Sequence, residues 1–153
     1  MNAIDLLLAD HKVVNELFKK VEGSGESEHP AIFRQIRAEL DVHAHIEETI
    51  FYPKLVADGN KPLVDIVLEG IEEHRQIKMF LKELDGLSGE STKFEPKLTV
   101  LQEDTEHHVK EEEEEMFPLV KKQFDADVLE ELGAAMEAEK VNFKKSQAAA
   151  GGK

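Results

Sequence analysis

The sequence predicts an all-α fold: an antiparallel up-and-down four-helix bundle, made of two similar helical hairpins, with a short fifth helix at the C-terminal end. Long stretches rich in Leu, Glu, Lys and Ala carry apolar residues at steps of three and four, as amphipathic helices do. Gly and Pro are few and cluster between these stretches. The connections are short, so consecutive helices are expected to run antiparallel.

Two amphipathic helices form the predicted first hairpin. The first covers about residues 3–22 and ends at Gly23-Ser24-Gly25. The second begins near Ser27 and Pro30, bends or ends near Pro53, and stops before Asp58-Gly59. One stripe of this second helix carries both apolar and metal-ligating residue types, at Ile32, Ile36, Leu40, His43, Glu47 and Ile50.

The second hairpin and the fifth helix follow in the same way. Asn60 can cap a third helix, which ends at Gly86, and a fourth helix covers about residues 94–122 with a late kink at Pro118. Asp125 or Asp127 caps a shorter fifth helix that is expected to end near Lys145. A single domain is therefore expected over residues 1–147, followed by a disordered tail at 148–153.

Charge and composition exclude several classes of protein and partner. The net charge of −14 argues against binding to nucleic acid or to anionic membrane surfaces, which both need a basic footprint. The absence of Cys excludes disulfides and thiolate metal sites. No apolar run approaches the ~18 residues of a membrane span, and the first residues do not resemble a secretion signal, so a cytoplasmic location is expected.

An internal repeat is the most informative feature of the sequence. A shift of 63 positions places His11 on His74, and a shift of 65 places His43 on His108 and Glu47 on Glu112. Residues four apart on a helix differ by only about 40° in azimuth, so each His-x-x-x-Glu pair points in one direction. All these residues lie on the apolar stripes, and a four-helix bundle would bring them together near its axis.

The cost of burying these groups predicts a metal site. Two unpaired carboxylates among four imidazoles in an apolar core would cost several kcal/mol each, whereas metal binding removes that penalty. Six such ligands are too many for one tetrahedral zinc and suit two ions bridged by the carboxylates. Imidazole and carboxylate ligands without sulfur suit iron, with manganese or zinc as substitutes, so the residues alone leave the metal open.

The chain resembles the hemerythrin-like proteins, the HHE cation-binding family, over nearly its whole length. A ferritin-like bundle is the alternative, but such proteins carry Glu-x-x-His, in the reverse order and with a different step. The resemblance is carried by the following segments: Asp10-His11-Lys12, His43-Ala-His-Ile-Glu47-Glu48 with Phe51-Tyr52-Pro53, Glu73-His74-Arg75, and His107-His108-Val-Lys-Glu-Glu112 with Phe117-Pro118.

The resemblance implies a di-iron centre with an oxo- or hydroxo-bridge and an open position for dioxygen. The implied ligands are four histidines and two bridging carboxylates, at His11, His43, His74, His108, Glu47 and Glu112. Oxygen-carrying hemerythrins have a further His one turn after the third-helix His. Here that position is Lys78, and its repeat partner is Asn15. Each iron is therefore expected to have two histidines, which favours reactivity over simple reversible carriage.

Three hypotheses about function remain open from the sequence. In the first, a di-iron binding protein takes up dioxygen, another small diatomic molecule or peroxide for sensing, storage or scavenging, and no side chain is assigned as catalytic. In the second, a di-iron redox enzyme acts on peroxide, nitric oxide or ferrous iron. In the third, the domain mediates interactions and its metal is structural or absent. The first is preferred, and a monomer and a dimer are both compatible with the sequence.

Residues that flank the predicted ligands receive secondary roles. His45 lies about 200° round the helix from His43 and is expected at the surface or in a helix interface. His107 is expected beside the site, and Glu115 on the inner face as an outer ligand or a hydrogen-bond partner of a His. Lys78 can pair with a bridging carboxylate or point outward. For Tyr52 we expect a packing role, with oxygen ligation as the alternative.

Overall fold

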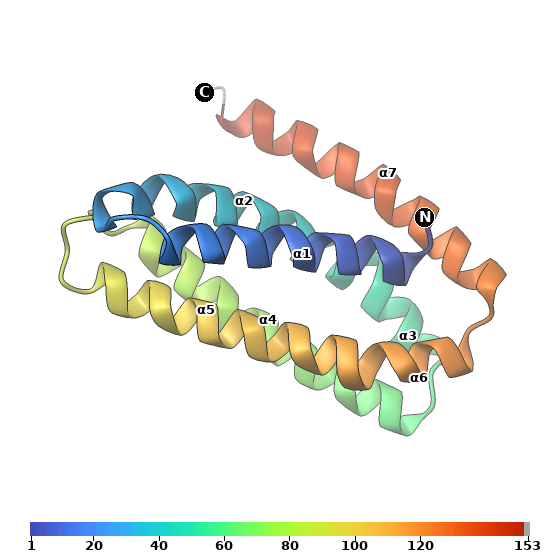
Figure 1. The fold of residues 1–153 in the computed structure, drawn as a ribbon. Helices are drawn as coiled ribbons and strands as arrows, with labels where there is room; N and C mark the ends of the chain where they lie inside the picture. Colours follow the sequence, from blue (N-terminus) through green and yellow to red (C-terminus); the bar gives the residue numbers. More distant parts are fainter. Residues whose placement is uncertain (152–153) are drawn as a thin grey trace.

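The computed structural model describes residues 1–151 and contains an antiparallel helical bundle with one additional helix on its outside (Figure 1). This confirms the predicted fold class. Two of the four columns of the bundle are single helices, and each of the other two is a long helix continued by a short one after a break. The helices are α1 (Ala3–Glu22), α2 (His29–Ile46), α3 (Tyr52–Asp58), α4 (Lys61–Asp85), α5 (Phe94–Glu111), α6 (Phe117–Gln123) and α7 (Ala126–Gly151).

The two breaks are π-helical turns, and both begin at a carboxylate that the sequence singled out. They cover Glu47–Phe51, between α2 and α3, and Glu112–Met116, between α5 and α6. Each is followed closely by a proline, Pro53 or Pro118. Since proline has no N–H and its ring clashes with the carbonyl four residues earlier, the α-helical pattern cannot continue unchanged across these positions. Single π turns inside α-helices are frequent at functional sites.

The helix ends follow the capping residues that the sequence contains. Asn60 caps α4, because its side chain accepts a hydrogen bond from the N–H of Leu63 at 3.2 Å. Asp125 caps α7 in the same way through the N–H of Val128 at 3.1 Å. The fifth helix is longer than predicted: α7 continues beyond Lys145 to Gly151, through the helix-favouring residues Ala148–Ala150. The last part of the expected disordered tail, residues 152–153, lies outside the described residues.

Helix α7 lies outside the bundle, along α1 and α2 and away from α4 and α5 (Figure 1). A Cβ atom at Gly133 would lie 2.1 Å from the carbonyl oxygen of Met1, so a glycine is needed for this close approach to the start of α1. Leu129 and Met136 of α7 are buried and belong to the apolar cluster near the α3–α6 end of the bundle. Within residues 1–151, none of the helices combines the length and apolar character that crossing a bilayer requires.

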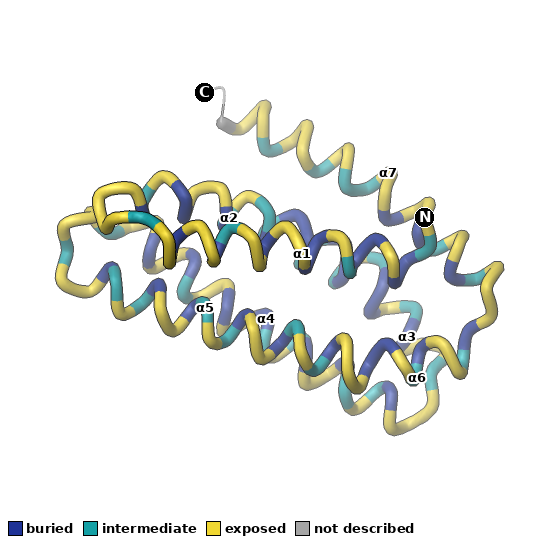
Figure 2. The backbone as a smooth tube through the Cα atoms, viewed as in Figure 1, coloured by how far each residue is buried: buried dark blue, intermediate teal, exposed yellow. Residues whose placement is uncertain are grey.

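The core consists of two apolar clusters, stacked along the bundle axis. One contains Leu7, Phe51 and Phe117 near the α3–α6 end, and the other contains Val14, Leu40 and Leu101 toward the opposite end. Buried positions follow the inward faces of the four columns, as Figure 2 shows. Between the two clusters lies a layer of buried polar residues. The fold therefore surrounds that layer with apolar side chains above and below.

Candidate metal centre

The six predicted ligands all lie in this single buried layer. His11 is on α1, His43 on α2, His74 on α4 and His108 on α5, while Glu47 and Glu112 are the first residues of the two π turns. Both carboxylates have no exposed surface, and the four histidines are also buried. The structure thus brings together every residue that the repeat singled out, on four different columns of the bundle.

Each buried carboxylate contacts histidines from both halves of the repeat. Glu47 Oε1 lies 3.0 Å from His43 Nε2 and 3.1 Å from His74 Nε2. Glu112 Oε1 lies 3.0 Å from His11 Nε2, and Glu112 Oε2 lies 3.4 Å from His108 Nε2. The two carboxylates therefore connect the two hairpins through the centre of the bundle.

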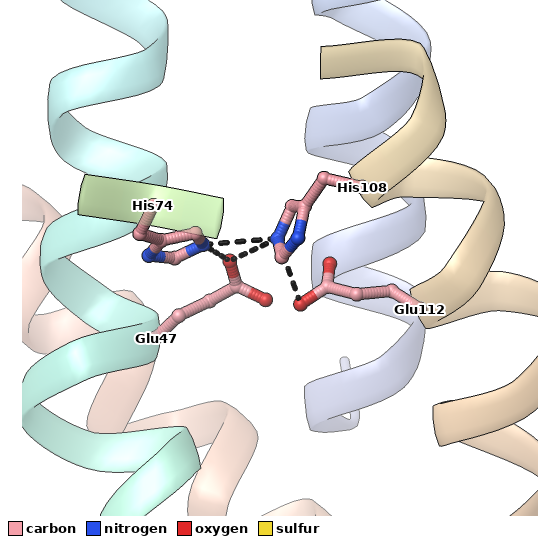
Figure 3. A group of neighbouring side chains, drawn as sticks. All are labelled: Glu47, His74, His108 and Glu112. Carbon is pink, nitrogen blue, oxygen red and sulfur yellow. Dashed lines mark hydrogen bonds and ion pairs between the residues drawn. The ribbon is translucent and has the colours of Figure 1, made fainter. Parts of the chain in front are cut away.

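The ligand atoms fall into two groups that share a carboxylate. Glu47, His74, His108 and Glu112 each offer an atom within 4.8 Å of the others, and His11 and His43 form a second such group with Glu112. Figure 3 shows the first group, in which the four side chains point toward one another: His108 and Glu112 come from one column, and Glu47 and His74 come from two others. Nε2 of His74 and Nε2 of His108 are 3.0 Å apart. This arrangement has the form of two neighbouring cation sites.

A second ring of carboxylates surrounds the histidines, and it was missed in the sequence. Each histidine places its Nδ1 against one of these carboxylates. Because a carboxylate can only accept, Nδ1 carries a proton, and Nε2 is the atom that faces the interior and can take up either a second proton or a cation. The pairs are His11 with Glu113 at 2.7 Å, His43 with Asp10 at 3.1 Å, His74 with Glu48 at 2.8 Å and His108 with Glu73 at 2.7 Å.

The repeat contains the signal that would have found this second ring. Asp10 and Glu73 are equivalent under the shift of 63, and Glu48 and Glu113 are equivalent under the shift of 65. Acidic residues duplicated beside duplicated histidines indicate hydrogen-bond partners that fix the imidazole rings. Such partners set the tautomer of a metal-ligating His and raise its basicity.

The charges in this layer strongly perturb the ionisation of its members. Burial alone would lower the pKa of His43, but the charge of Glu47 and the hydrogen bond to Asp10 raise it to about 10. Burial also opposes ionisation of Glu47, yet the neighbouring histidines hold its pKa well below the usual range. Burial would likewise lower the pKa of His108, but the charge of Glu112 raises it far above the ordinary value. The buried carboxylates thus demand positive charge beside them.

Protons on the histidines satisfy this demand only in part. Among the described residues, both oxygens of Glu47 and the Nε2 of His43 have no hydrogen-bond partner, although His43 Nε2 lies 3.0 Å from Glu47 Oε1. Nε2 of His74 and Nε2 of His108 are so close that they can share one proton, whereas a proton on each would set two N–H groups against each other. Cations bound at Nε2 and the carboxylate oxygens remove both penalties. The residues present therefore fit a two-metal group.

The two halves of the layer differ at one aromatic position. Tyr52 is buried, and its Oη donates a hydrogen bond to Glu112 Oε2 while lying 3.3 Å from His74 Nε2 and 3.4 Å from His108 Nε2. Its repeat equivalent is Phe117, whose ring stacks on His11 with a centroid distance of 6.0 Å. Burial raises the pKa of Tyr52 well above 10, and the charge of Glu112 adds to this, so the phenol stays a donor. Tyr52 therefore has a polar role beyond packing.

A small apolar cavity borders all four histidines on the side away from Tyr52. Its volume is about 20 Å³, and its walls include Val14, Leu40, Ile77, Leu81 and Thr105. A cavity needs roughly 10–15 Å³ to hold one water-sized molecule. The hydroxyl of Thr105 donates to the Leu101 carbonyl at 2.7 Å and so does not turn its proton into the cavity. The space suits a small, weakly polar molecule next to the layer.

The flanking residues take different places. His45 lies in the α2–α7 interface, with Nε2 2.9 Å from Glu139 and its ring stacked on Phe143. His107 is exposed and sits beside the site, 3.3 Å from Glu73. Lys78 points outward and contacts Glu48 at 2.5 Å. These positions agree with the interpretations of His45 and His107, and for Lys78 the contact is to an outer carboxylate and not to a bridging one.

The expected position of Glu115 on the inner face is wrong. Glu115 is exposed, and Met116 takes the buried position instead. The cause is the π turn that begins at Glu112, since its wider turn delays the inward-facing position by one residue. Beyond Glu112, the regular helical step that placed Glu115 beside His108 therefore no longer applies.

Comparisons with known proteins agree with this geometry. The family described as the hemerythrin HHE cation-binding domain matches residues 2–120. An uncharacterized protein of Mycobacterium tuberculosis is 33% identical over 141 residues, which cover 90% of this chain and 84% of that protein. The crystal structure of a hemerythrin HHE cation-binding domain-containing protein from Mycobacterium kansasii is 29% identical. It superposes with a TM-score of 0.80 over 95% of this chain and 89% of that one.

A further relative is considerably longer. A protein of Nostoc named DNA nickase is 26% identical over 144 residues, which cover 92% of this chain but 39% of the nickase. The shared part is thus this helical domain, within a protein most of whose length this chain does not span.

Proposed function

The chain belongs to the hemerythrin HHE cation-binding domain family, and from that premise we propose that it is a non-haem di-iron protein that binds or reacts with dioxygen. One observation carries this proposal. Each of the two fully buried carboxylates, Glu47 and Glu112, touches histidines from both halves of the chain. A carboxylate between two pairs of imidazoles has the placement of a bridge between two ions.

The residues divide the work of holding the ions. His11 and His43 would ligate one ion through Nε2, and His74 and His108 the other. Glu47 and Glu112 would bridge the two ions and neutralise part of their charge. Nitrogen and oxygen donors without sulfur support iron, and manganese or zinc would fit the same donors.

The surroundings of the layer support reaction with a small molecule. A bound ferrous pair would supply the electrons that dioxygen or peroxide takes up. The protein contributes the apolar cavity of about 20 Å³, which sits against the histidines and has room for one small molecule. Tyr52 holds a phenol proton at Oη, beside Glu112 and on the opposite side of the layer. That proton is the nearest neutral donor to the bridging carboxylate.

A redox enzyme is the second candidate, and the position of Lys78 favours it. Oxygen-carrying hemerythrins have a further His at the position that Lys78 occupies here. Here the side chain of Lys78 is half exposed and pairs with Glu48, and the repeat-equivalent Asn15 is also exposed. Neither residue supplies a ligand, so each ion would keep more open positions. Open positions on both ions favour turnover of peroxide, nitric oxide or ferrous iron over reversible carriage.

Anaerobic loading followed by mixing with an oxidant tests the proposal. The chain is loaded with two ferrous ions and mixed with oxygen or with peroxide while the visible spectrum is recorded. A charge-transfer band that forms with oxygen and reverses on its removal supports carriage, and repeated consumption of oxidant supports catalysis. A loaded chain whose spectrum and oxidant concentration do not change in either case would contradict both and leave a structural metal.

A variant of the cavity makes this test specific. Ala44 lines the cavity, so Ala44→Leu should fill it and slow the reaction while two ions stay bound. Ala38 lies on the same helix with its side chain exposed, and Ala38→Leu is the matched control that should react at the normal rate. Equal rates in both variants would mean that the oxidant reaches the ions by another route.

A further inference from the structure

Helix α7 lies beyond the family-matched residues 2–120, yet one of its side chains reaches the ring around the histidines. Lys140 donates through Nζ to Asp10 Oδ1. The other oxygen, Asp10 Oδ2, accepts the Nδ1–H of His43 at 3.1 Å. A continuous chain of contacts thus runs from α7 through one carboxylate to a predicted metal ligand.

Asp10 differs from the other three outer carboxylates in its burial. The exposed fraction of its side chain is 6%, compared with 18% for Glu73, 28% for Glu48 and 38% for Glu113. Water can reach the other three carboxylates, of which Glu73 and Glu48 are half-buried and Glu113 is exposed, and can replace or reorient their partners at little cost. A buried carboxylate has no such alternative and depends on protein donors for its orientation.

The second half of the repeat has no corresponding buried carboxylate held by a lysine among the described residues. Glu73 is the repeat equivalent of Asp10, and its second oxygen faces the exposed His107 at 3.3 Å. The other lysine near the ring, Lys78, is half exposed and contacts Glu48 at the surface. Helix α7 packs against α1, α2 and the π turn Glu47–Phe51, on the outside of the first hairpin (Figure 1). The fixed ammonium group therefore serves one histidine of the four.

We propose that Lys140 is a positioning residue of the metal centre: it fixes Asp10, and through Asp10 it holds the His43 imidazole with Nε2 toward the interior. The ion bound by His11 and His43 then depends on α7, and the ion bound by His74 and His108 does not. This inference rests on the proposed two-ion function. It assigns to α7 a part in metal binding that the family match does not include.

The sign of the effect separates positioning from simple electrostatics. A lysine near two dications repels them, so removing its charge would tighten metal binding if electrostatics alone mattered. Removing a group that orients a ligand should weaken binding, as loss of outer hydrogen-bond partners commonly does by 10- to 100-fold. The two explanations predict opposite changes in the affinity for the first-hairpin ion.

Calorimetric titration of the metal-free full chain with Zn²⁺ measures this change. Lys140→Met should weaken one of two binding steps by about tenfold and leave the other within about twofold, on the scale of other outer partners. Lys140→Arg, which keeps a cationic donor, should restore most of the affinity. Unchanged or tighter binding in Lys140→Met would overturn the proposal, and so would an equal loss in both steps.

Two control variants address other causes. Glu139→Ala removes the contact of α7 with His45 but does not touch Asp10, so it should leave both affinities unchanged. A loss in Glu139→Ala as large as in Lys140→Met would mean that docking of α7 in general, and not Lys140, is responsible. Lys78→Met removes the surface lysine of the second half and should not reproduce the loss at the His43 step.

Nuclear magnetic resonance of the imidazole N–H groups tests the link without relying on affinity. In the metal-free and the Zn²⁺-loaded chain, Lys140→Met should shift or broaden the Nδ1–H signal of His43 and leave that of His108 in place. An unmoved His43 signal overturns the proposal. Should Lys140→Met fail to fold, Lys140→Leu, which also removes the donor, is measured in its place. A wild-type chain that binds fewer than two ions contradicts the proposed function, whereas the His43 signal still decides the link to Lys140.

Discussion

His11 and Glu112 meet across the repeat: Nε2 of the first lies 3.0 Å from Oε1 of the second, although they belong to different hairpins. Glu47 makes the corresponding contact with His74 at 3.1 Å. Neither hairpin contains a complete set of ligands, so the layer forms only when both hairpins are folded against each other. Metal bound there would stabilise the assembled bundle, because it would have no comparable site in the unfolded chain.

Substitution of the inner histidines should separate metal ligands from neighbours. We expect His43→Ala and His108→Ala each to abolish stoichiometric iron binding. His45→Ala should retain two ions, since His45 contacts Glu139 and Phe143 in the α7 interface. Iron content per chain after anaerobic loading measures this, and equal losses in all three variants would show that the repeat has been misinterpreted.

Loss of an outer carboxylate should weaken metal binding without abolishing it. Glu113 accepts the Nδ1–H of His11 at 2.7 Å, so Glu113→Ala removes the group that fixes this ring. The expected loss in metal affinity is about 10- to 100-fold. Glu114→Ala, at the adjacent exposed position, is the matched control and should bind normally. The account would fail here if both variants bound with wild-type affinity in a competitive chelator titration.

Removal of the Tyr52 hydroxyl should matter more without metal than with it. Tyr52→Phe takes the donor from Glu112 and makes this position resemble Phe117 in the other half. Leaving a buried acceptor without its donor costs about 1–3 kcal/mol. In the loaded chain the ions satisfy Glu112, so the loss in the free energy of unfolding should be smaller. Loss of an ion in Tyr52→Phe would instead identify Tyr52 as a ligand.

The stability of the metal-free chain should fall at alkaline pH. Folding raises the pKa of His43 from 6.5 to about 10, so its stabilising effect is complete below pH 6.5 and is lost as pH rises toward 10. Folding holds the pKa of Glu47 below its ordinary 4.5, so its contribution is present above that pH and is lost on acidification. The metal-free chain should therefore be most stable between about pH 4.5 and pH 6.5.

Bound metal should prevent the loss of stability at alkaline pH. A bound ion replaces the proton at Nε2, so deprotonation no longer leaves the carboxylates unpaired, and metal affinity itself rises with pH. Urea unfolding at pH 6 and pH 9, with chelator or with excess metal, measures the difference. A metal-free chain that is equally stable at both pH values would refute the assigned ionisation of the layer.

The sequence was sufficient to predict the fold and the convergence of the inner six residues because both depend on regular patterns. Amphipathic spacing located the helices, and the repeat separated His43 and His108 from the unduplicated His45 and His107. The outer ring was missed because Asp10 and Glu73 lie next to a histidine in sequence but bond to a histidine on another helix. Contacts between helices depend on rotation and depth that spacing alone does not fix.

Other differences have local causes. The π turn displaced Glu115 from the inner face. No residue within this turn indicates a change of helical step, and the one signal nearby is Pro118, which follows it. The role of Tyr52 depends on how deeply its side chain is buried at the start of α3, directly after the π turn Glu47–Phe51. The length of α7 was underestimated because Ala-rich ends can fray or continue, and helix propensity alone does not decide between them.

Anaerobic titration of the metal-free chain with ferrous ions tests the central claim most directly. The account predicts that bound iron rises linearly and stops at two ions per chain, with the melting temperature rising alongside. A titration that stops at zero or one ion, or a melting temperature that is the same with and without iron, would contradict a shared two-ion centre at Glu47 and Glu112.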